Sequence, residues 1–132
     1  AILEMDTNVF GASRKRVLEW LLEGGKQFAF VIYDQDAVNG YCFGRTGFNF
    51  TQIGPVISND VATAIELVSG ALRNSTNAAI ILDTPARSPE WIQWLESIGF
   101  EEQRTLIRMY RGSNEYPGIP EKQFAILGPE LG

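Results

Sequence analysis

Asp83 is the side chain best placed to do chemistry in this sequence. It directly follows Ala78–Leu82, a continuously apolar run typical of a central strand covered on both faces. Ligands in open α/β sheets bind beyond the carboxyl ends of the strands, so a carboxylate here could accept a proton from a bound substrate. The alternative interpretation is a turn-forming aspartate ahead of Thr84-Pro85.

Two further polar residues, Arg45 and Gln52, lie on adjacent predicted strands where a substrate cleft would open. Tyr41 shares a predicted strand with Arg45 and completes this predicted cleft. Aromatic residues nearby could line an apolar pocket for a small ligand, although ordinary sheet packing explains them equally well; they are Tyr41, Phe43, Phe48 and Phe50. Cys42 is interpreted as a small core residue rather than a nucleophile.

The composition excludes several kinds of site. The chain has no histidine, which removes Ser–His and Cys–His nucleophilic systems and histidine-ligated zinc, and no metal site is predicted. The net charge of −5 argues against a nucleic-acid partner. The basic triplet Arg14-Lys15-Arg16 is interpreted as a solvated helix face. The single cysteine fits a reducing compartment and the apolar runs are too short to cross a bilayer, so we expect a cytoplasmic protein without a membrane partner.

The order of the predicted elements indicates the fold class. After a short lead over Ala1–Gly11, Ser13 is expected to cap a helix that ends at Gly24-Gly25. Three strands in an antiparallel meander should follow, with a turn at Asn39-Gly40. The rest alternates: a helix over Asp60–Arg73, the strand Ala78–Leu82, a helix from the Ser88-Pro89 start to Gly99, and two last strands. The predicted meander strands are Phe28–Tyr33, Tyr41–Arg45 and Phe48–Ile57, and the last two strands are Phe100–Tyr110 and Gln123–Leu127.

This order predicts an α/β (α+β) architecture, in which a mixed, mostly antiparallel twisted sheet is flanked by helices. The order and several local strings resemble the GNAT superfamily of acyl-CoA-dependent N-acetyltransferases, and more narrowly the C-terminal domain of tandem GNAT proteins. The resemblance covers nearly the whole chain, taken as one domain over residues 1–132 that could be half of a longer protein. The strings that carry it are Phe10–Arg14, Gly40-Tyr41, Ile53–Ile57, Leu82–Pro85, Ile98–Phe100 and Gly128–Gly132.

The resemblance implies a site for acetyl-CoA between a splayed fourth and fifth strand. The pantetheine arm would pair with the free edge of the fourth strand, and Gly54-Pro55 marks a bulge or splay point there. The pyrophosphate would lie at the start of the next helix. The cofactor-binding residues implied in this way are Ile53, Val56, Ile57, Ser58, Val61, Ala62 and Thr63. The family's glycines and basic residue are missing from this loop, and Asp60 is equally explained as a helix-start acid.

The resemblance implies transfer of an acetyl group to a small amine or an N-terminus, with Asp83 and Ser88 as the catalytic candidates. Ser88 stands where many family members have an asparagine, and it is equally a helix cap. Leu95 stands where many family members have a tyrosine that protonates the departing thiolate, and leucine cannot donate a proton. The alternative is a non-catalytic GNAT module for dimerisation or ligand binding. As a homodimer, or as one domain of a tandem protein, it would cover the surface that a lone half exposes.

Overall fold

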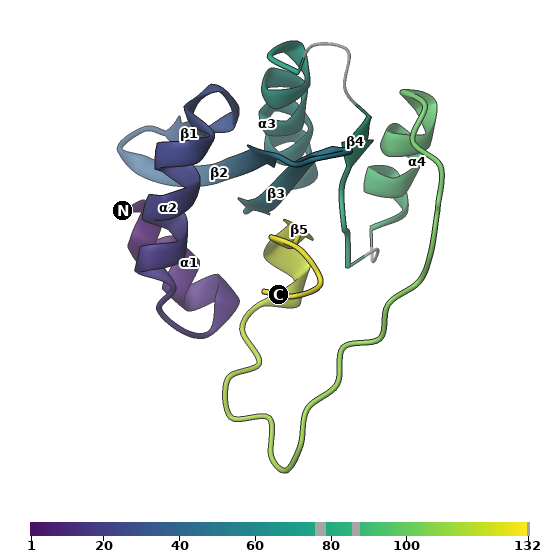
Figure 1. Cartoon of the computed structure of the whole chain (residues 1–132). Coiled ribbons are helices and arrows are strands. Elements are labelled where there is room, and N and C mark those ends of the chain that lie inside the picture. Colours follow the sequence, from purple (N-terminus) through teal and green to yellow (C-terminus); the bar gives the residue numbers. More distant parts are fainter. Residues whose placement is uncertain (76–78, 86–87, 132) are drawn as a thin grey trace.

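The computed structural model describes residues 1–75, 79–85 and 88–131 and consists of one sheet with helices on both faces (Figure 1). Each element begins and ends as follows. The strands are β1 (Phe30–Asp34), β2 (Ala37–Thr46), β3 (Thr51–Ser58), β4 (Ile80–Ile81) and β5 (Gln123–Ala125). The helices are α1 (Ile2–Phe10), α2 (Lys15–Gly24), α3 (Val61–Arg73) and α4 (Pro89–Ser97), with short 3₁₀ turns η1 (Lys26–Phe28) and η2 (Pro120–Lys122).

The sheet has the order β1-β2-β3-β4, and β5 pairs with β3. The first three strands form an antiparallel meander, β4 is parallel to β3, and β5 is antiparallel to β3. Helices α3 and α4 pack against one face of the sheet, whereas α1 and α2 pack against the other. The predicted mixed, mostly antiparallel sheet flanked by helices is therefore confirmed.

Strand β3 carries a bulge at Gly54-Pro55. Cys42 of β2 lies opposite Val56, and Gly44, two residues further along β2, lies opposite Ile53. Three steps along β3 thus match two along β2, which is the signature of an extra residue in one strand. Because of the bulge, Ile53 and Val56 both face the α3 side and are fully buried there.

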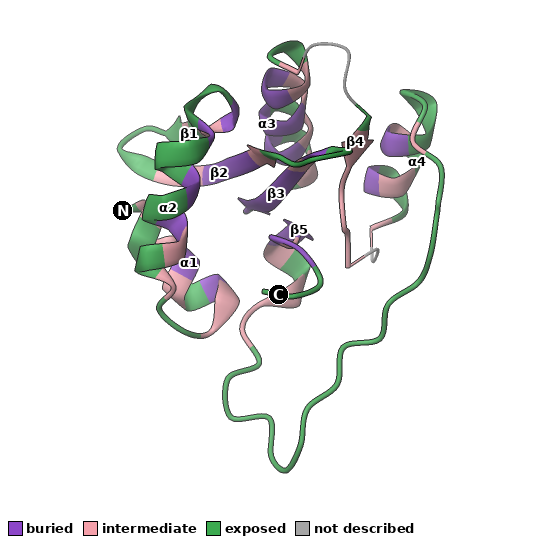
Figure 2. Cartoon of the chain, in the orientation of Figure 1, coloured by how far each residue is buried: buried purple, intermediate pink, exposed green. Residues whose placement is uncertain are grey.

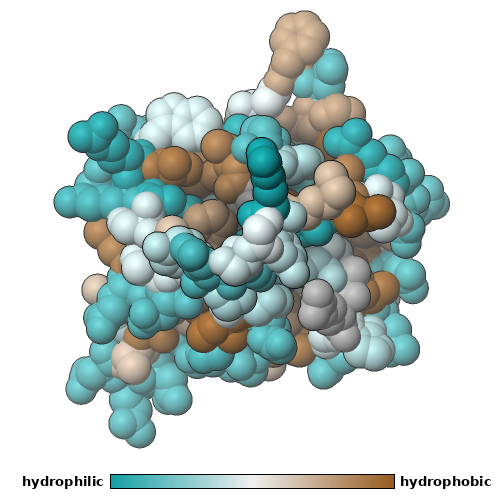
Figure 3. Space-filling view, turned by 90° about the horizontal axis from the view of Figure 1, so that it is seen from below, coloured by the Kyte–Doolittle hydropathy of each residue, from teal (hydrophilic) through white to brown (hydrophobic). Residues whose placement is uncertain are grey.

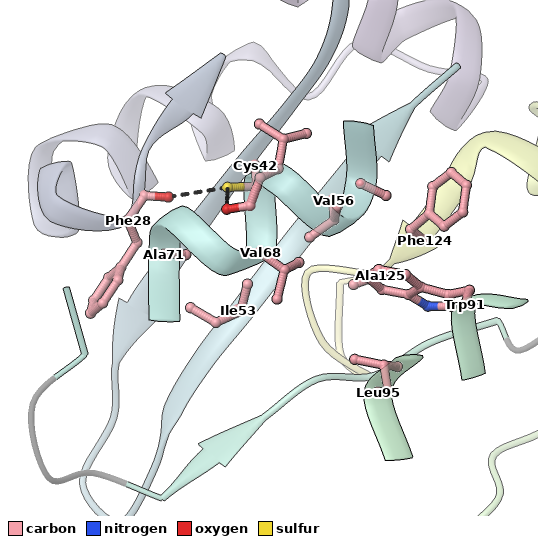
Figure 4. Packing of buried hydrophobic residues seen from close by; sticks show 12 residues of the cluster. Phe28, Cys42, Ile53, Val56, Val68, Ala71, Trp91, Leu95, Phe124 and Ala125 are labelled. Atoms are coloured by element: carbon pink, nitrogen blue, oxygen red, sulfur yellow. Dashed lines mark hydrogen bonds between the residues drawn. The ribbon is translucent and has the colours of Figure 1, made fainter. Parts of the chain in front are cut away.

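Buried side chains form one cluster on each face of the sheet. The ribbon of the buried residues is purple in Figure 2, for example along β2 and β3. The larger cluster joins α3 and α4 to the sheet, and Phe124 of β5 meets Trp91 of α4 edge-on with ring centroids 5.3 Å apart (Figure 4). Strand β5 is therefore part of the core despite its length of three residues. Among the described residues, no helix is both long and apolar enough to span a membrane.

The beginning of the chain differs from the prediction. Residues 2–10 form the helix α1 instead of an irregular lead. Its buried side carries Val9 together with the charged Asp6, and this charge interrupts the apolar pattern that would indicate a helix. Helix α2 begins after Arg14, which occupies the N-cap position predicted for Ser13.

One turn and one strand boundary also differ from the prediction. The reversal between β1 and β2 lies at Gln35-Asp36, where Gln35 has φ of 53°, and Asn39 and Gly40 lie inside β2. The predicted strand Ala78–Leu82 is described only from residue 79, since Ala78 lies outside the described residues, and its ladder is limited to Ile80–Ile81.

Residues 100–110 were predicted as a strand, and this prediction is wrong. Phe100 packs against the larger core cluster, and residues 101–110 run as an irregular, exposed segment that leads away from α4 toward η2 as an open loop (Figures 1 and 2). The physical reason lies in β5, the expected partner. One side of β5 pairs with β3, and the Ile126 N–H that follows it donates to the Asp83 carbonyl at 2.8 Å. Among the described residues, the C-terminal run thus has its partners in β3 and at Asp83, and it forms no ladder with residues 100–110.

Candidate functional site

Strands β3 and β4 run together for two residue pairs and then separate. Thr51 pairs with Ile80 and Gln52 with Ile81. Beyond this point β5 enters between them, where Val56 pairs with Ala125 and Ile57 with Gln123. The predicted divergence of the two strands is therefore present, but protein backbone occupies the space between them.

The edge of β3 that was expected to be free is closed by this insertion. Ile53, Val56, Ile57 and Ser58 are each no more than 1 % exposed. At Gly54 the Ile126 carbonyl oxygen lies so near that a β-carbon on this residue would be 2.0 Å from it. The glycine is required here because the second backbone passes directly over it. A pantetheine arm could reach this edge only by displacing residues 123–127.

The start of α3 is closed by a side chain of the protein itself. Asp60 is the N-cap, and its carboxylate accepts a hydrogen bond from the Thr63 backbone N–H at 2.7 Å. This bond, with those from the Asn39 amide and the Thr63 hydroxyl, holds the pKa of Asp60 below its usual value. Ser58 Oγ in turn contacts the Asp60 backbone. The negative charge of Asp60 occupies the position where a helix N-terminus would otherwise hold an anion.

A cavity of about 540 Å³ opens between the end of α2 and the β2–β3 hairpin. It brings together two of the predicted cleft residues, Arg45 and Gln52. The cavity is lined by Trp20, Leu21, Gly24, Arg45, Thr46, Gly47, Phe48, Asn49, Phe50, Gln52 and Ile81. Trp20, near the middle of α2, was not predicted, because nothing in its local pattern separates it from a surface residue of that helix.

Polar contacts hold both cavity residues in place. The Gln52 amide nitrogen donates to Asp83 Oδ2 at 2.7 Å, so the carboxylate predicted to act as a base is joined to the cavity wall. The Arg45 guanidinium pairs with Glu130 at 2.5 Å and holds the pKa of that carboxyl below its usual value. The site thus combines aromatic walls with a fixed amide and an ion pair.

Tyr41 does not line this cavity, which corrects the prediction. Its ring is fully buried on the α1–α2 face, and its hydroxyl donates a hydrogen bond to Asp6 Oδ1. Arg14 completes the group by pairing with the same carboxylate at 2.8 Å, and it is 8 % exposed, so it is not part of a solvated basic face. Phe43 is likewise buried in this cluster, whereas Phe48 and Phe50 do line the cavity.

Ser88 acts as the N-cap of α4, with its hydroxyl oxygen 3.4 Å from the Trp91 backbone nitrogen. The Trp91 indole N–H donates to Thr84 just after Asp83, so Thr84 is tied to the buried Trp91 of α4. Cys42 is buried, and burial raises the pKa of its thiol to about 12. A thiol held protonated is a core group rather than a nucleophile.

The fold and the sequence match proteins of known class. Residues 2–125 match the model of the acetyltransferase (GNAT) domain, and the chain belongs to this family. It is similar to holothin acyltransferase of Pseudoalteromonas sp. (strain SANK 73390), with 30% identity over 132 residues. That match covers 99% of this chain and 45% of the relative, so the chain spans less than half the relative's length.

The fold is also similar to that of a solved structure. The crystal structure of a point mutant of TTHA1254 from Thermus thermophilus matches with a TM-score of 0.60 at 14% identity. The match covers 85% of this chain and 92% of that chain. At this identity the likeness concerns the fold alone, and it agrees with the GNAT architecture expected from the order of elements.

GNAT domains typically use acyl-CoA, and the residues of this chain do not fit that cofactor in the arrangement described here. The β3 edge at Val56 and Ile57 is paired with β5. Gly54 is covered by the Ile126 carbonyl, and the start of α3 is capped by the Asp60 carboxylate. A cofactor carrying several phosphates would meet a negative charge at this helix start.

Proposed function

We propose that this domain serves N-acyl transfer to a small amine, and that the cavity between α2 and the β2–β3 hairpin receives the amine. The observation that carries the proposal is the pair Gln52–Asp83, which joins a carboxylate to the wall of a ligand-sized cavity in a GNAT domain. The relative is itself named an acyltransferase, which supports the same reaction class.

The proposed chemistry needs little from this chain. An amine attacks an acyl group only after it has lost its proton, and one carboxylate, acting directly or through a water molecule, suffices to accept it. Asp83 is assigned this role, with Gln52 as the residue that positions its carboxylate. Aromatic walls from Trp20, Phe48 and Phe50 favour an amine with a flat, apolar body. Ser88 remains a weaker catalytic candidate, because its hydroxyl oxygen already caps α4.

The acyl donor is proposed to be held by a second GNAT domain. The support is the covered edge of β3 together with the match to less than half of holothin acyltransferase, which leaves room for another domain in a protein of that kind. The cavity is open to the surface beside exposed Phe48, so a donor bound elsewhere could approach it.

A non-catalytic module is the second candidate. The insertion of β5 next to β3 and the Asp60 cap favour it, because both close the places where a donor would bind. In this case the chain would bind neither amine nor donor, and its function would be to pair with another domain.

An NMR titration of the chain with a panel of aromatic and aliphatic amines distinguishes the two candidates. We expect saturable shifts of the Gln52 side-chain amide and the Trp20 indole, with weaker binding in Gln52→Ala. Gln93→Ala, the same change at an exposed glutamine of α4 that does not line the cavity, is the matched control and should bind normally. A complete lack of shifts across the panel would reject the amine site and leave the module.

Acyl transfer is tested by mixing the chain with acetyl-CoA, an amine that binds in the NMR titration, and a GNAT domain that binds acetyl-CoA. The rate at which the free thiol of CoA is released measures turnover. We expect Asp83→Asn to lower turnover by roughly 10²- to 10⁴-fold, the usual contribution of a general base, with little change in amine affinity. An unchanged turnover in Asp83→Asn would remove Asp83 from the catalytic role.

A further inference from the structure

Residues 101–111 form an extended segment whose backbone is unpaired. Among the residues that the structure describes, none of their N–H or C=O groups bonds to another backbone group. All of them are exposed, and Ile107, Met109 and Tyr110 are 82%, 84% and 70% exposed. An exposed run of this kind, with β-branched and aromatic side chains, resembles an edge strand whose backbone groups are free to pair with another strand.

The later part of this segment, residues 104–111, differs from the rest of the chain in charge. Arg104, Arg108 and Arg111 contribute +3 without an acidic residue between them, and because the whole chain carries −5, the remainder carries −8. A basic segment on an acidic protein is complementary to another copy of the same protein. The described ion pairs do not involve these arginines.

A matching surface exists at the free edge of the sheet. Strand β1 is the terminal strand in the sheet order, with β2 as its described partner. Its side chains Val31 and Tyr33 are 37% and 55% exposed. The strand ends at Asp34 and the turn after it carries Asp36, and both aspartates are exposed. This edge therefore offers unpaired backbone groups, apolar side chains and negative charge together.

We propose that residues 104–111 of one chain add as a strand to the β1 edge of a second copy, which gives a homodimer. In a parallel alignment that sets Ile107 beside Val31 and Met109 beside Tyr33, Arg111 reaches the acidic turn at Asp36. A two-fold axis allows each copy to donate and to accept one strand, so the assembly closes. The inference does not depend on the proposed acyl transfer.

Other apolar surface is less suited to this role. Figure 3 shows hydrophobic side chains in separate patches between hydrophilic ones on the face seen from below. Strand β4, at the opposite end of the strand order from β1, has a ladder of only two residues among those described. The β1 edge offers five residues, which is a usual strand length.

Analytical ultracentrifugation with a proline variant tests the proposal. Proline at residue 107 removes a ladder donor, and Ile107→Pro should weaken the dimer by about tenfold or more, the effect of losing one or two hydrogen bonds. Asn114→Pro, outside the pairing segment, is the matched control and should dimerise normally. Hydrogen exchange of the Phe30–Asp34 amides should slow as protein concentration rises, and Ile107→Pro should abolish this protection.

A charge exchange gives a second, independent readout. Arg111→Glu should weaken the dimer, and Arg111→Glu combined with Asp36→Arg should restore it, because the attraction is rebuilt with reversed signs. A chain that stays monomeric at high micromolar concentration, or a dimer indifferent to Ile107→Pro, would overturn the proposal. Failure of the charge exchange to restore a weakened dimer would overturn the parallel alignment to β1.

Discussion

The Tyr41 hydroxyl donates a hydrogen bond to the Asp6 carboxylate inside the protein, and both residues are essentially inaccessible to water. Arg14 neutralises the same carboxylate with a contact of 2.8 Å, and its guanidinium lies 4.1 Å from the centre of the Phe10 ring. This group ties α1, the start of α2 and β2 into one unit. A buried charge is tolerated only when it is paired and hydrogen-bonded, as here.

Asp6→Ala should be the most damaging single change in this group. It removes the carboxylate that both Arg14 and Tyr41 contact, and breaking a buried pair usually costs about 3–5 kcal/mol of unfolding free energy. Tyr41→Phe leaves the Asp6–Arg14 pair in place and should cost about 1.5–3 kcal/mol. Urea unfolding measures both. The exposed pair Lys15–Glu19 provides the control, and Glu19→Ala should change stability by less than about 0.5 kcal/mol.

Cys42 should be unreactive toward a thiol reagent such as iodoacetamide in the folded protein, and it should react on unfolding in urea. Burial raises the pKa of its thiol from 9.0 to about 12, so the reactive thiolate is scarce at neutral pH, and the side chain is also inaccessible. Mass spectrometry after labelling measures the difference. Rapid labelling of the native protein at pH 7 would contradict the buried position of Cys42.

Stability should fall between pH 9 and pH 12. In this range the unfolded chain releases the Cys42 proton while the folded chain keeps it, so the unfolded state binds fewer protons and gains stability as pH rises. Burial and the neighbouring Asp6 raise the pKa of Tyr41 as well, which adds a loss of the same sign above pH 10. Urea midpoints at pH 8 and pH 10.5 test this, and the decline should be shallower in Cys42→Ala.

Asp60 should stabilise the protein as a helix cap in a pH-dependent way. Asp60→Ala is expected to cost about 1 kcal/mol at pH 7, whereas Asp60→Asn keeps an acceptor for the Thr63 N–H and should cost less. The pKa of Asp60 is lowered in the folded protein, so its contribution is present above pH 3.8 and is lost as the pH falls through the lower folded value. Thermal unfolding across the acid range should show this loss in the wild type and not in Asp60→Asn.

Gly54→Ala should destabilise the protein by about 1–3 kcal/mol, because the new methyl group would overlap the Ile126 carbonyl. Gly24→Ala is the matched control. A β-carbon there meets nothing within 4 Å, and alanine in a helix should stabilise by about 0.5–1 kcal/mol. Equal effects of the two substitutions in chemical denaturation would show that residues 126–127 do not lie against Gly54.

The sequence was most informative where local pattern and end signals agree. The apolar stripe of α3 and the Ser88-Pro89 start of α4 predicted both helices close to their observed bounds, because capping residues are local chemistry. Glycine and proline are both unfavourable inside a strand, and their presence at Gly54-Pro55 predicted the bulge that the pairing of β2 with β3 shows. The family likeness followed from the order of these elements.

Tertiary contacts decided the remainder. Helix α1 was not predicted because a charged residue, Asp6, lies on its buried side. The residues that make this burial possible, Arg14 and Tyr41, lie outside the helix, so the local pattern does not reveal them. The strand pattern at residues 104–110 is genuine, but a pattern cannot tell whether a neighbouring edge is available. For the site, Arg45 and Gln52 line one cavity, and its use as a substrate cleft stays a prediction, whereas Tyr41 lies in the buried cluster on the α1–α2 face.

The insertion of β5 has a consequence for biosynthesis. Val56 waits for a ladder partner, Ala125, that the ribosome makes 69 residues later. Bringing such distant segments together slows folding, because the entropy of closing the intervening loop is lost before the contacts between the two strands stabilise the chain. Once β1, β2 and β3 of a nascent chain have left the ribosome, the β3 edge at Val56 therefore stays unpaired until β5 is also available. During that interval this edge can pair with other polypeptides.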